Sequence, residues 1–186
     1  MTTRLDLICT SASGGRIYAS SAPGKIDRPK GIYRDLETDL EALSRLGITV
    51  IICLIEDFEF EKLSITDYPA RAIEQGCTFI HYPIPDHCTP DRLDSFHELI
   101  VDIYRFFNNG SRILVHCRGG VGRTGLVCAA VLLHYGFEAD QSIAAVKSRR
   151  AKALRNQNQC QFVRHYDRLL LSPLSRLQVA QPHRAV

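Results

Sequence analysis

Two periods of apolar residues run along the chain and predict where helices and strands lie. Leucines at positions 36, 40, 43 and 46 recur every three to four residues, and Gly47 follows them. This spacing predicts a helix over residues 35–46 that ends at the glycine. Residues 48–55 are a continuous run rich in β-branched side chains, which is typical of a strand buried on both faces.

The rest of the chain continues this alternation. Thr89 is a typical helix cap and Pro90 suits the first helical position, so a helix is predicted from there to about residue 107. The prolines at positions 83 and 85 exclude regular structure from residues 83–86. The other predicted elements are a short edge strand at 17–19, strands at 78–82 and 112–116, and helices at 68–75, 123–135, 139–149 and 157–171.

Strands that alternate with helices predict an α/β fold, a single domain with a mainly parallel central sheet flanked by helices. We assign residues 1–171 to this domain. Residues 172–186 contain prolines and no clear periodicity, so we expect a frayed C-terminal tail. Ligands bind beyond the carboxyl ends of the strands in such sheets. The strand at 112–116 ends directly before Cys117, and a site is expected there.

Length and charge exclude several classes of protein. The 186 residues suit one hydrophobic core, and the formal net charge of +3 is only mildly basic. No long Lys/Arg tract is present, which argues against a nucleic-acid partner. The longest apolar runs, residues 48–55 and 126–135, are far shorter than the roughly 18 residues of a membrane-spanning helix. No signal peptide is expected, because no extended apolar segment follows the N-terminal charge.

The cysteines indicate a reducing compartment. There are seven of them, an odd number, and none forms a Cys-x-x-Cys pair. This usage predicts reduced thiols and a cytoplasmic location rather than a disulfide framework. The histidines show no paired spacing with cysteines or carboxylates, so no metal site is expected. The sequence does not determine the oligomeric state, for which a monomer is the simplest expectation.

The most informative segment is residues 116–125, His-Cys-Arg-Gly-Gly-Val-Gly-Arg-Thr-Gly. A cysteine six positions before an arginine is weak evidence in a chain with many of both. Here, however, Cys117 follows a predicted strand, three glycines fill the loop, and Arg123 begins a predicted helix. Glycines let backbone N–H groups turn inward, and such a ring of donors at a helix N-terminus binds an anion and stabilises a thiolate.

The side chains of this segment are each expected to contribute to one reaction. Cys117 is the candidate nucleophile, and Thr124 is expected to donate a hydrogen bond to its sulfur. Arg123 is expected to reach back over the loop and bind two phosphate oxygens with its planar guanidinium group. The predicted substrate-binding set is Arg118, Gly119, Gly120, Val121, Gly122 and Arg123.

The same segment resembles the signature loop of the cysteine-based protein tyrosine phosphatase superfamily, His-Cys-x5-Arg-Ser/Thr. The chain lacks the length and the phosphotyrosine-recognition loop of the classical tyrosine-specific domains and is more similar to the compact dual-specificity phosphatases. Within these it is most similar to the kinase-associated phosphatases of cyclin-dependent kinases, on residues 83–91, Pro-Ile-Pro-Asp-His-Cys-Thr-Pro-Asp. The similarity extends loosely over residues 20–169. It implies a phosphatase fold, a phosphorylated protein substrate, a phospho-cysteine intermediate, and no metal or organic cofactor.

A general acid must protonate the leaving group, a contribution typically worth about 10²–10⁴ in rate. The resemblance implies Asp86, which lies on the proline-stiffened segment about thirty residues before Cys117. It then activates water as a base in the second step. Asp91 is the rival, although the helix dipole alone explains a carboxylate in the first turn of the helix predicted there. Asp57 is a third candidate.

The resemblance also implies supporting residues. His116 is expected to order the loop and tune the thiolate. Gln159 is expected to orient the water of the second step, although residues 155–159 depart from the family's commoner pattern. Arg118 is expected either to face the substrate or to be solvated. Cys53 and Cys88 are candidates for a protective disulfide with Cys117.

A basic cluster, residues 149–155, has two interpretations. It either docks an acidic peptide or an inositol phosphate head group, or it is a solvated helix end that complements its own dipole. The second interpretation is the simpler one.

Three other functions compete with a phosphoprotein phosphatase. A rhodanese-like sulfurtransferase also uses a cysteine loop, but its loop usually differs in length and does not continue Arg-Thr-Gly. A phosphopeptide-binding module usually has its cysteine or arginine replaced, and both are present here. A phosphoinositide or small-molecule phosphatase shares the mechanism. Gly119 and Gly120, in place of the loop lysines typical of phosphoinositide enzymes, favour a phosphoprotein. Phosphotyrosine is the expected substrate, with phosphoserine and phosphothreonine as further candidates.

Overall fold

The computed structural model describes residues 2–171, and its centre is a five-stranded sheet in the order β1-β2-β7-β5-β6. Four strands are parallel neighbours, and β1 pairs antiparallel with β2 at one edge. The strands are β1 (Asp6–Thr10), β2 (Arg16–Ser21), β5 (Val50–Cys53), β6 (Thr78–His81) and β7 (Arg112–Cys117). A second, small sheet pairs β3 (Ile26–Asp27) with β4 (Ile32–Tyr33). The predicted α/β domain with a mainly parallel sheet is confirmed.

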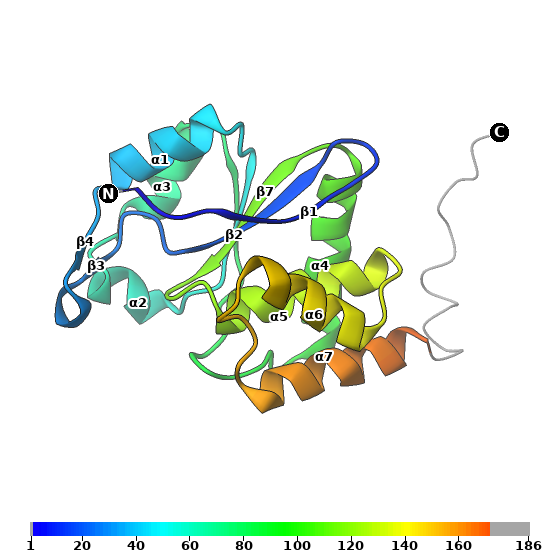
Figure 1. Ribbon diagram of the computed structural model, residues 1–186. Coiled ribbons are helices and arrows are strands. Elements are labelled where there is room, and N and C mark those ends of the chain that lie inside the picture. Colours follow the sequence, from blue (N-terminus) through cyan, green and yellow to red (C-terminus); the bar gives the residue numbers. More distant parts are fainter. Residues whose placement is uncertain (1, 172–186) are drawn as a thin grey trace.

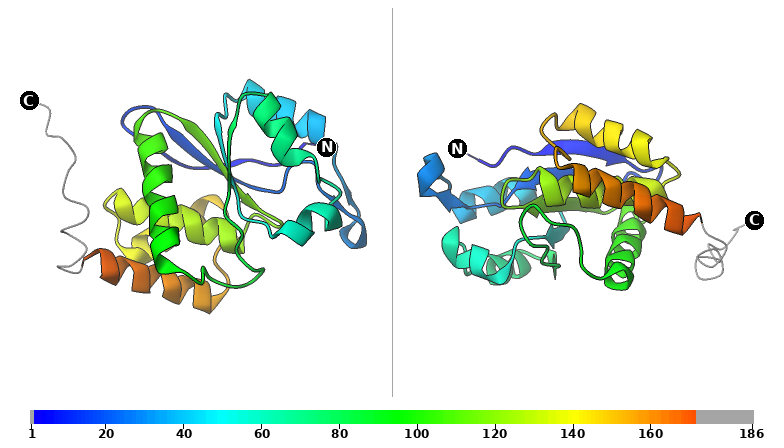
Figure 2. Two further views of the ribbon diagram at one scale, coloured as in Figure 1. Left: turned by 180° about the vertical axis from the view of Figure 1, so that it is seen from behind. Right: turned by 90° about the horizontal axis from the view of Figure 1, so that it is seen from below.

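Helices cover both faces of the central sheet (Figure 1). One face is covered by α1 (Leu36–Arg45), α2 (Asp57–Lys62) and α3 (Tyr68–Glu74). The other is covered by α4 (Leu93–Asn108), α5 (Gly122–His134), α6 (Ala139–Arg149) and α7 (Gln157–Leu170). Seen from behind in Figure 2, the α1–α3 group lies on one side of the sheet and α4 on the other.

The buried strands explain this two-sided packing. Successive side chains of a strand point to opposite faces. Ile51 and Leu114 therefore pack with the α1–α3 side, and Ile52 and Val115 pack with the α4–α7 side. The run that reads as continuously apolar in the sequence is buried on both faces, as predicted.

Most predicted elements are found within one or two residues of their expected bounds, but three predictions were wrong. The strand at 17–19 is not an edge strand, because β2 lies between β1 and β7. The helix expected to start after Thr89 begins at Leu93 instead, with Arg92 as its N-cap. Asp91 therefore lies in a loop and not in a first helical turn. Side chains of Asn156 and Gln159 hold residues 87 and 88 as a loop directly before this start.

Several elements were not predicted. They are β1, α2 and the β3–β4 pair, which are short and carry polar residues among their apolar ones. The tail prediction for residues 172–186 lies outside the described residues. No helix among residues 2–171 is long and apolar enough to cross a membrane.

Candidate active site

Cys117 is the last residue of β7, at the carboxyl edge of the parallel strands. Its register partner on β2 is Ser21, and the preceding residue, His116, pairs with Cys53 on β5. We call residues 117–122 the Cys117 loop; it runs from this strand directly into α5. The thiol is almost fully buried, and the N–H of Gly120 donates to its Sγ at 3.2 Å. The expected strand–loop–helix arrangement is therefore present, with a backbone amide turned inward.

Two glycines of the Cys117 loop lie against other parts of the chain. Gly120 has φ +69°, and a Cβ there would lie 2.1 Å from the backbone oxygen of Ser20. A Cβ on Gly122 would lie 2.9 Å from Oε1 of Gln159. Position 120 requires glycine, because the backbone adopts positive φ there and another backbone segment approaches closely. At position 122 the close neighbour is the end of the Gln159 side chain.

The outward carbonyls of the Cys117 loop accept bonds from two cations. Lys25 Nζ donates to the carbonyl of Arg118 at 3.0 Å. Arg150 donates from Nε to the carbonyl of Gly120 and from Nη2 to that of Gly119 at 3.4 Å. Because the carbonyls are held outside, the amides of the same peptides point inward. Two positive charges thereby sit behind a loop suited to an anion.

Arg150 is itself held in place by a carboxylate. Its Nη1 pairs with Asp6 on β1, and both side chains are largely buried. In the basic cluster 149–155, this arginine is therefore a structural support of the loop. The interpretation of the cluster as a solvated helix end or docking patch does not apply to Arg150.

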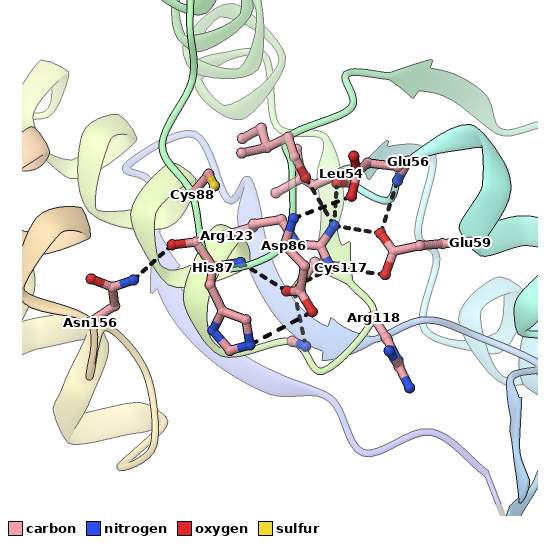
Figure 3. A network of polar contacts seen from close by, with 12 residues as sticks. Leu54, Glu56, Glu59, Asp86, His87, Cys88, Cys117, Arg118, Arg123 and Asn156 are labelled. Atoms are coloured by element: carbon pink, nitrogen blue, oxygen red, sulfur yellow. Dashed lines mark hydrogen bonds and ion pairs between the residues drawn. The ribbon is translucent and has the colours of Figure 1, made fainter. Parts of the chain in front are cut away.

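Arg123 lies buried at the start of α5 and is fixed by Glu59. Nη1 and Nη2 donate to the two carboxylate oxygens of Glu59 at 2.6 and 3.1 Å. Nη1 also donates to the carbonyls of Leu54 and Ile84. Burial disfavours the charged guanidinium, but the hydrogen bonds of Glu59 and the charges of Cys117, Glu59 and Asp86 outweigh it and raise the pKa of Arg123 above its ordinary value. The guanidinium group thus remains charged and has one orientation (Figure 3).

Asp86 approaches this arginine from a second loop, residues 83–91, which we call the Asp86 loop. Its Oδ1 lies 3.1 Å from Nη2 of Arg123. The carboxylate is 43% exposed, whereas the arginine side chain is 1% exposed. His87, at φ 63°, donates its backbone N–H to the same carboxylate at 3.1 Å. The predicted acid and the predicted phosphate-binding arginine are therefore in contact, and the acid is on the solvent side.

Three side chains hold the Asp86 loop from outside. Oε2 of Glu56 accepts from the N–H of Asp86 at 3.3 Å. Asn156, the N-cap of α7, donates to the carbonyl of His87 at 2.7 Å. Gln159 donates to the carbonyl of Cys88 at 2.9 Å. The loop is thus anchored to α2 on one side and to α7 on the other (Figure 3).

Gln159 lies between the two loops. Its side chain is buried, and its Oε1 faces Gly122 with no hydrogen-bond partner within residues 2–171. An unpaired acceptor at this place suits a water molecule. Its role in orienting the second-step water remains a prediction.

Two predicted side chains do not contact the sulfur or the arginine. Thr124 is fully buried, but its hydroxyl has no partner in the described part of the chain, so the expected bond to the sulfur is not seen. Arg118 points away from Arg123 (Figure 3) and donates to Asp27 at 3.3 Å. Only its backbone belongs to the Cys117 loop.

His116 lies in the core directly before the Cys117 loop. It is fully buried, and the hydroxyl of Tyr68 lies 3.1 Å from its Nε2. Burial lowers the pKa of His116 to about 3. The ring is therefore neutral at physiological pH and acts as a hydrogen-bonding group in the core.

The rival acids lie elsewhere. Asp91 is exposed, and no ion pair or hydrogen bond connects it to Arg123 among the described residues. Asp57 is 91% exposed at the start of α2, near the ring of His81. The geometry favours Asp86 over both.

Sequence reasoning missed the roles of Glu59 and Glu56, and of three donors to loop carbonyls, Lys25, Arg150 and Asn156. Glu59 follows the buried strand β5 by six positions, and acidic residues at strand ends are a usable signal. The other three contact loop carbonyls, which accept bonds from any suitable donor. No local pattern marks such residues.

The remaining cysteines are unpaired. All seven are free thiols, and burial raises the pKa of Cys53 to about 12. No group of three histidine, cysteine or carboxylate residues suited to a metal ion occurs in the described chain. Whether oxidation joins Cys53 or Cys88 to Cys117 remains a prediction.

Comparison with known proteins gives a consistent result. Residues 31–169 match the family described as "PTP-SAK: Swiss Army Knife protein, DSP-PTPase phosphatase domain". The chain is 31% identical over 105 residues to cyclin-dependent kinase inhibitor 3 of Rattus norvegicus, covering 56% of this chain and 49% of the rat protein. It is 28% identical over 142 residues to the Homo sapiens protein of that name, covering 75% and 64%. The chain thus spans about half to two thirds of the length of these relatives.

Similar folds occur in solved structures. A structure of kinase associated phosphatase, with its catalytic-site cysteine replaced by serine, aligns with a TM-score of 0.82 at 22% identity, covering 92% of this chain and 98% of that one. The structure of Tk-PTP in its active form aligns with a TM-score of 0.68 at 23% identity, covering 88% and 96%. At these identities the alignments show the fold alone.

Proposed function

The chain belongs to the DSP-PTPase phosphatase domain family, and on that premise we propose that it hydrolyses phosphotyrosine in proteins through a phospho-cysteine intermediate on Cys117. Phosphoserine and phosphothreonine are further candidate substrates. The observation that carries the proposal is that three groups suited to this reaction are held at the carboxyl end of β7, where the buried thiol lies. They are the inward amide of Gly120, the Glu59-fixed guanidinium of Arg123, and the carboxyl group of Asp86.

In the first step, the thiolate of Cys117 attacks phosphorus, and the bond from phosphorus to the leaving oxygen breaks. Asp86 gives its proton to that oxygen. The loop amides and Arg123 hold the three non-bridging oxygens, whose negative charge increases in the transition state. No metal or organic cofactor takes part in this proposal.

In the second step, water attacks the phospho-cysteine, and the bond between phosphorus and sulfur breaks. Asp86, now a carboxylate, takes the proton of that water. Gln159, with its unpaired Oε1 beside Gly122, is the proposed partner for this water. Inorganic phosphate leaves, and Cys117 returns to its thiolate.

The ion pair between Asp86 and Arg123 occupies a position that the phosphoryl group of a substrate would take. A phosphoryl group bonded to Nη2 would replace the carboxylate there, and Asp86 would be released towards the exposed side where the leaving group lies. Glu59 would keep its bonds throughout, because it is buried and accepts from both Nη1 and Nη2. It is proposed as a positioning residue.

We further propose a phosphorylated protein as partner and a cytoplasmic monomer as the active form. The relatives are named as cyclin-dependent kinase inhibitors, which suggests kinases among the substrates to test. The unpaired cysteines support a reducing compartment.

The first test is hydrolysis of p-nitrophenyl phosphate in the presence of a metal chelator, with and without vanadate. We expect vanadate-sensitive turnover that is abolished in Cys117→Ser. Cys77→Ser is the matched control, because Cys77 precedes β6 at the far end of the sheet, and it should be fully active. Full activity of Cys117→Ser would overturn the nucleophile assignment. A panel of phosphotyrosine, phosphothreonine and phosphoinositide substrates then tests the substrate class.

A further inference from the structure

We propose that a cationic pocket beside the Cys117 loop binds an acidic group next to the phosphorylated residue of a peptide substrate. This inference rests on the proposed function and defines its substrate class more closely. The pocket is a surface cavity of about 200 Å³ whose charged lining residues are Asp27, Arg28, Lys62 and Arg118. Nothing in the reaction described above uses it.

Two segments distant in sequence form the walls of the pocket. One is β3 with the 3₁₀ turn that follows it, Arg28–Lys30, and the other is the C-terminal end of α2. The N–H of Ile26 donates to the carbonyl of Leu63 at 2.9 Å and joins the two walls. Arg118 completes the lining, and its own backbone is part of the Cys117 loop. The pocket therefore adjoins the Cys117 loop through Arg118.

The charge of the pocket is positive and largely uncompensated. Asp27, whose side chain is 1% exposed, pairs with Arg118 at 3.3 Å and with Lys30 at 3.8 Å. Arg28 and Lys62 are exposed and form no ion pair within the described chain. Nε of Arg118 is buried and has no hydrogen-bond partner among residues 2–171. Three cations, Arg28, Lys62 and Arg118, therefore line the pocket with one carboxylate, Asp27, which leaves donors for an incoming anion.

The position of the pocket favours an extended peptide. Residues one or two places from the phosphorylated residue lie about 3.5–7 Å away along an extended chain, within reach of the Arg118 side chain. Lys62 also lies over the ring of Phe58, 6.0 Å from its centroid, and this ring is 58% exposed. An apolar surface beside a cationic pocket suits a peptide with an acidic side chain or a second phosphate at that place.

The test compares two phosphotyrosine peptides that differ only in glutamate or glutamine at the positions flanking the phosphotyrosine. We measure kcat/KM of the enzyme and, separately, the affinity of the Cys117→Ser variant for each peptide. The double substitution Arg28→Gln with Lys62→Gln removes two exposed cations from the pocket. Lys147→Gln with Arg168→Gln removes one lysine and one arginine from exposed positions of α6 and α7, outside the basic cluster 149–155, and is the matched control.

We expect the acidic peptide to be preferred by about fivefold, in line with a few partly exposed charge pairs, and less at high salt. The preference should disappear in the pocket variant and persist in the control. Equal use of both peptides by the unmodified enzyme, or equal loss in both variants, would overturn the proposal. The Cys117→Ser variant could bind the acidic peptide more tightly while the unmodified enzyme turns over neither peptide. That result would support the pocket and reject the phosphatase mechanism.

Discussion

The Cys117 loop and the Asp86 loop face each other across Arg123, but they are held in different ways. The Cys117 loop is buried, and its backbone is fixed by glycine contacts and by the cations Lys25 and Arg150 on its carbonyls. The Asp86 loop is exposed, and three side chains from two helices hold it. A loop fixed through the core should lose stability and activity together when its supports are changed. A loop held by side chains at the surface should lose activity alone.

This difference matches the chemistry proposed for each loop. Groups that bind an anion gain from a rigid, dry environment, since they need no reorganisation during the reaction. An acid that leaves Arg123 when substrate enters must be able to move. Five predictions test whether the two loops separate in this way.

The largest effect is expected for Glu59→Gln. The change leaves the buried guanidinium of Arg123 without its counter-charge, which costs about 3 kcal/mol or more of the free energy of unfolding, and turnover should fall with it. Urea unfolding and p-nitrophenyl phosphate kinetics measure both. Glu61→Gln, an exposed neighbour on α2, is the control and should change stability by less than about 0.5 kcal/mol. Equal stability of the two variants would contradict the role of the buried pair.

Asp86→Asn should lower kcat by about 10² or more on phosphotyrosine peptide, while the free energy of unfolding changes by less than about 0.5 kcal/mol. The reason is that the carboxylate is partly exposed and its loss removes a proton donor rather than core packing. Asp91→Asn is the control. A large loss in Asp91→Asn with normal turnover in Asp86→Asn would assign the acid to Asp91.

Arg150→Met should destabilise the protein by about 1–3 kcal/mol, because it leaves the carbonyls of Gly119 and Gly120 without their donor. KM should rise as well, since the loop amides lose their common direction. Arg149→Met, its exposed neighbour on α6, should be nearly neutral in both measurements. An unchanged KM in Arg150→Met would show that the loop keeps its shape without this support.

Lowering the pH should destabilise the protein through His116, the buried residue directly before Cys117. In the unfolded chain His116 takes up a proton below about pH 6.5, but in the folded protein its pKa is about 3. The unfolded state therefore binds more protons between these values, and stability falls as pH falls through this window. From pH 7.5 to 5.5 this group contributes a loss on the order of 1 kcal/mol. An NMR titration in which the His116 ring protonates near pH 6.5 would contradict its burial.

The smallest effect is expected for Asn156→Ser. Serine keeps a cap oxygen for α7 but is too short to donate to the carbonyl of His87. We expect kcat to fall about threefold to tenfold with nearly unchanged stability, because one bond of the Asp86 loop is lost. Asn158→Ser, at an exposed position two residues further along the same helix, is the control. If Asn156→Ser lowers the free energy of unfolding by more than it raises the activation free energy calculated from kcat, the distinction between the two loops is removed.

Much of the fold followed from local pattern. Residues 48–55 and 112–116 read as buried strands, and the leucine spacing at 36–46 reads as a helix, because burial on one or two faces leaves a period in the sequence. Reliance on local signals also explains why the start of α4 was predicted too early. Thr89 and Pro90 carry a helix-start signal, but the bonds from Asn156 and Gln159 hold the preceding residues as a loop.

The sequence by itself determined the strand–loop–helix around Cys117, the identity of Arg123, and Asp86 as the candidate acid. These residues are close in the chain or marked by prolines and glycines, whose backbone preferences are local. Only the tertiary structure decided that Glu59 fixes Arg123, that Lys25 and Arg150 support the loop, and that Arg118 turns to Asp27. Such contacts join residues up to 144 positions apart, as between Arg150 and Asp6. Their partners are backbone carbonyls and buried charges, which many donors could satisfy, so their positions follow only from the packing of the folded chain.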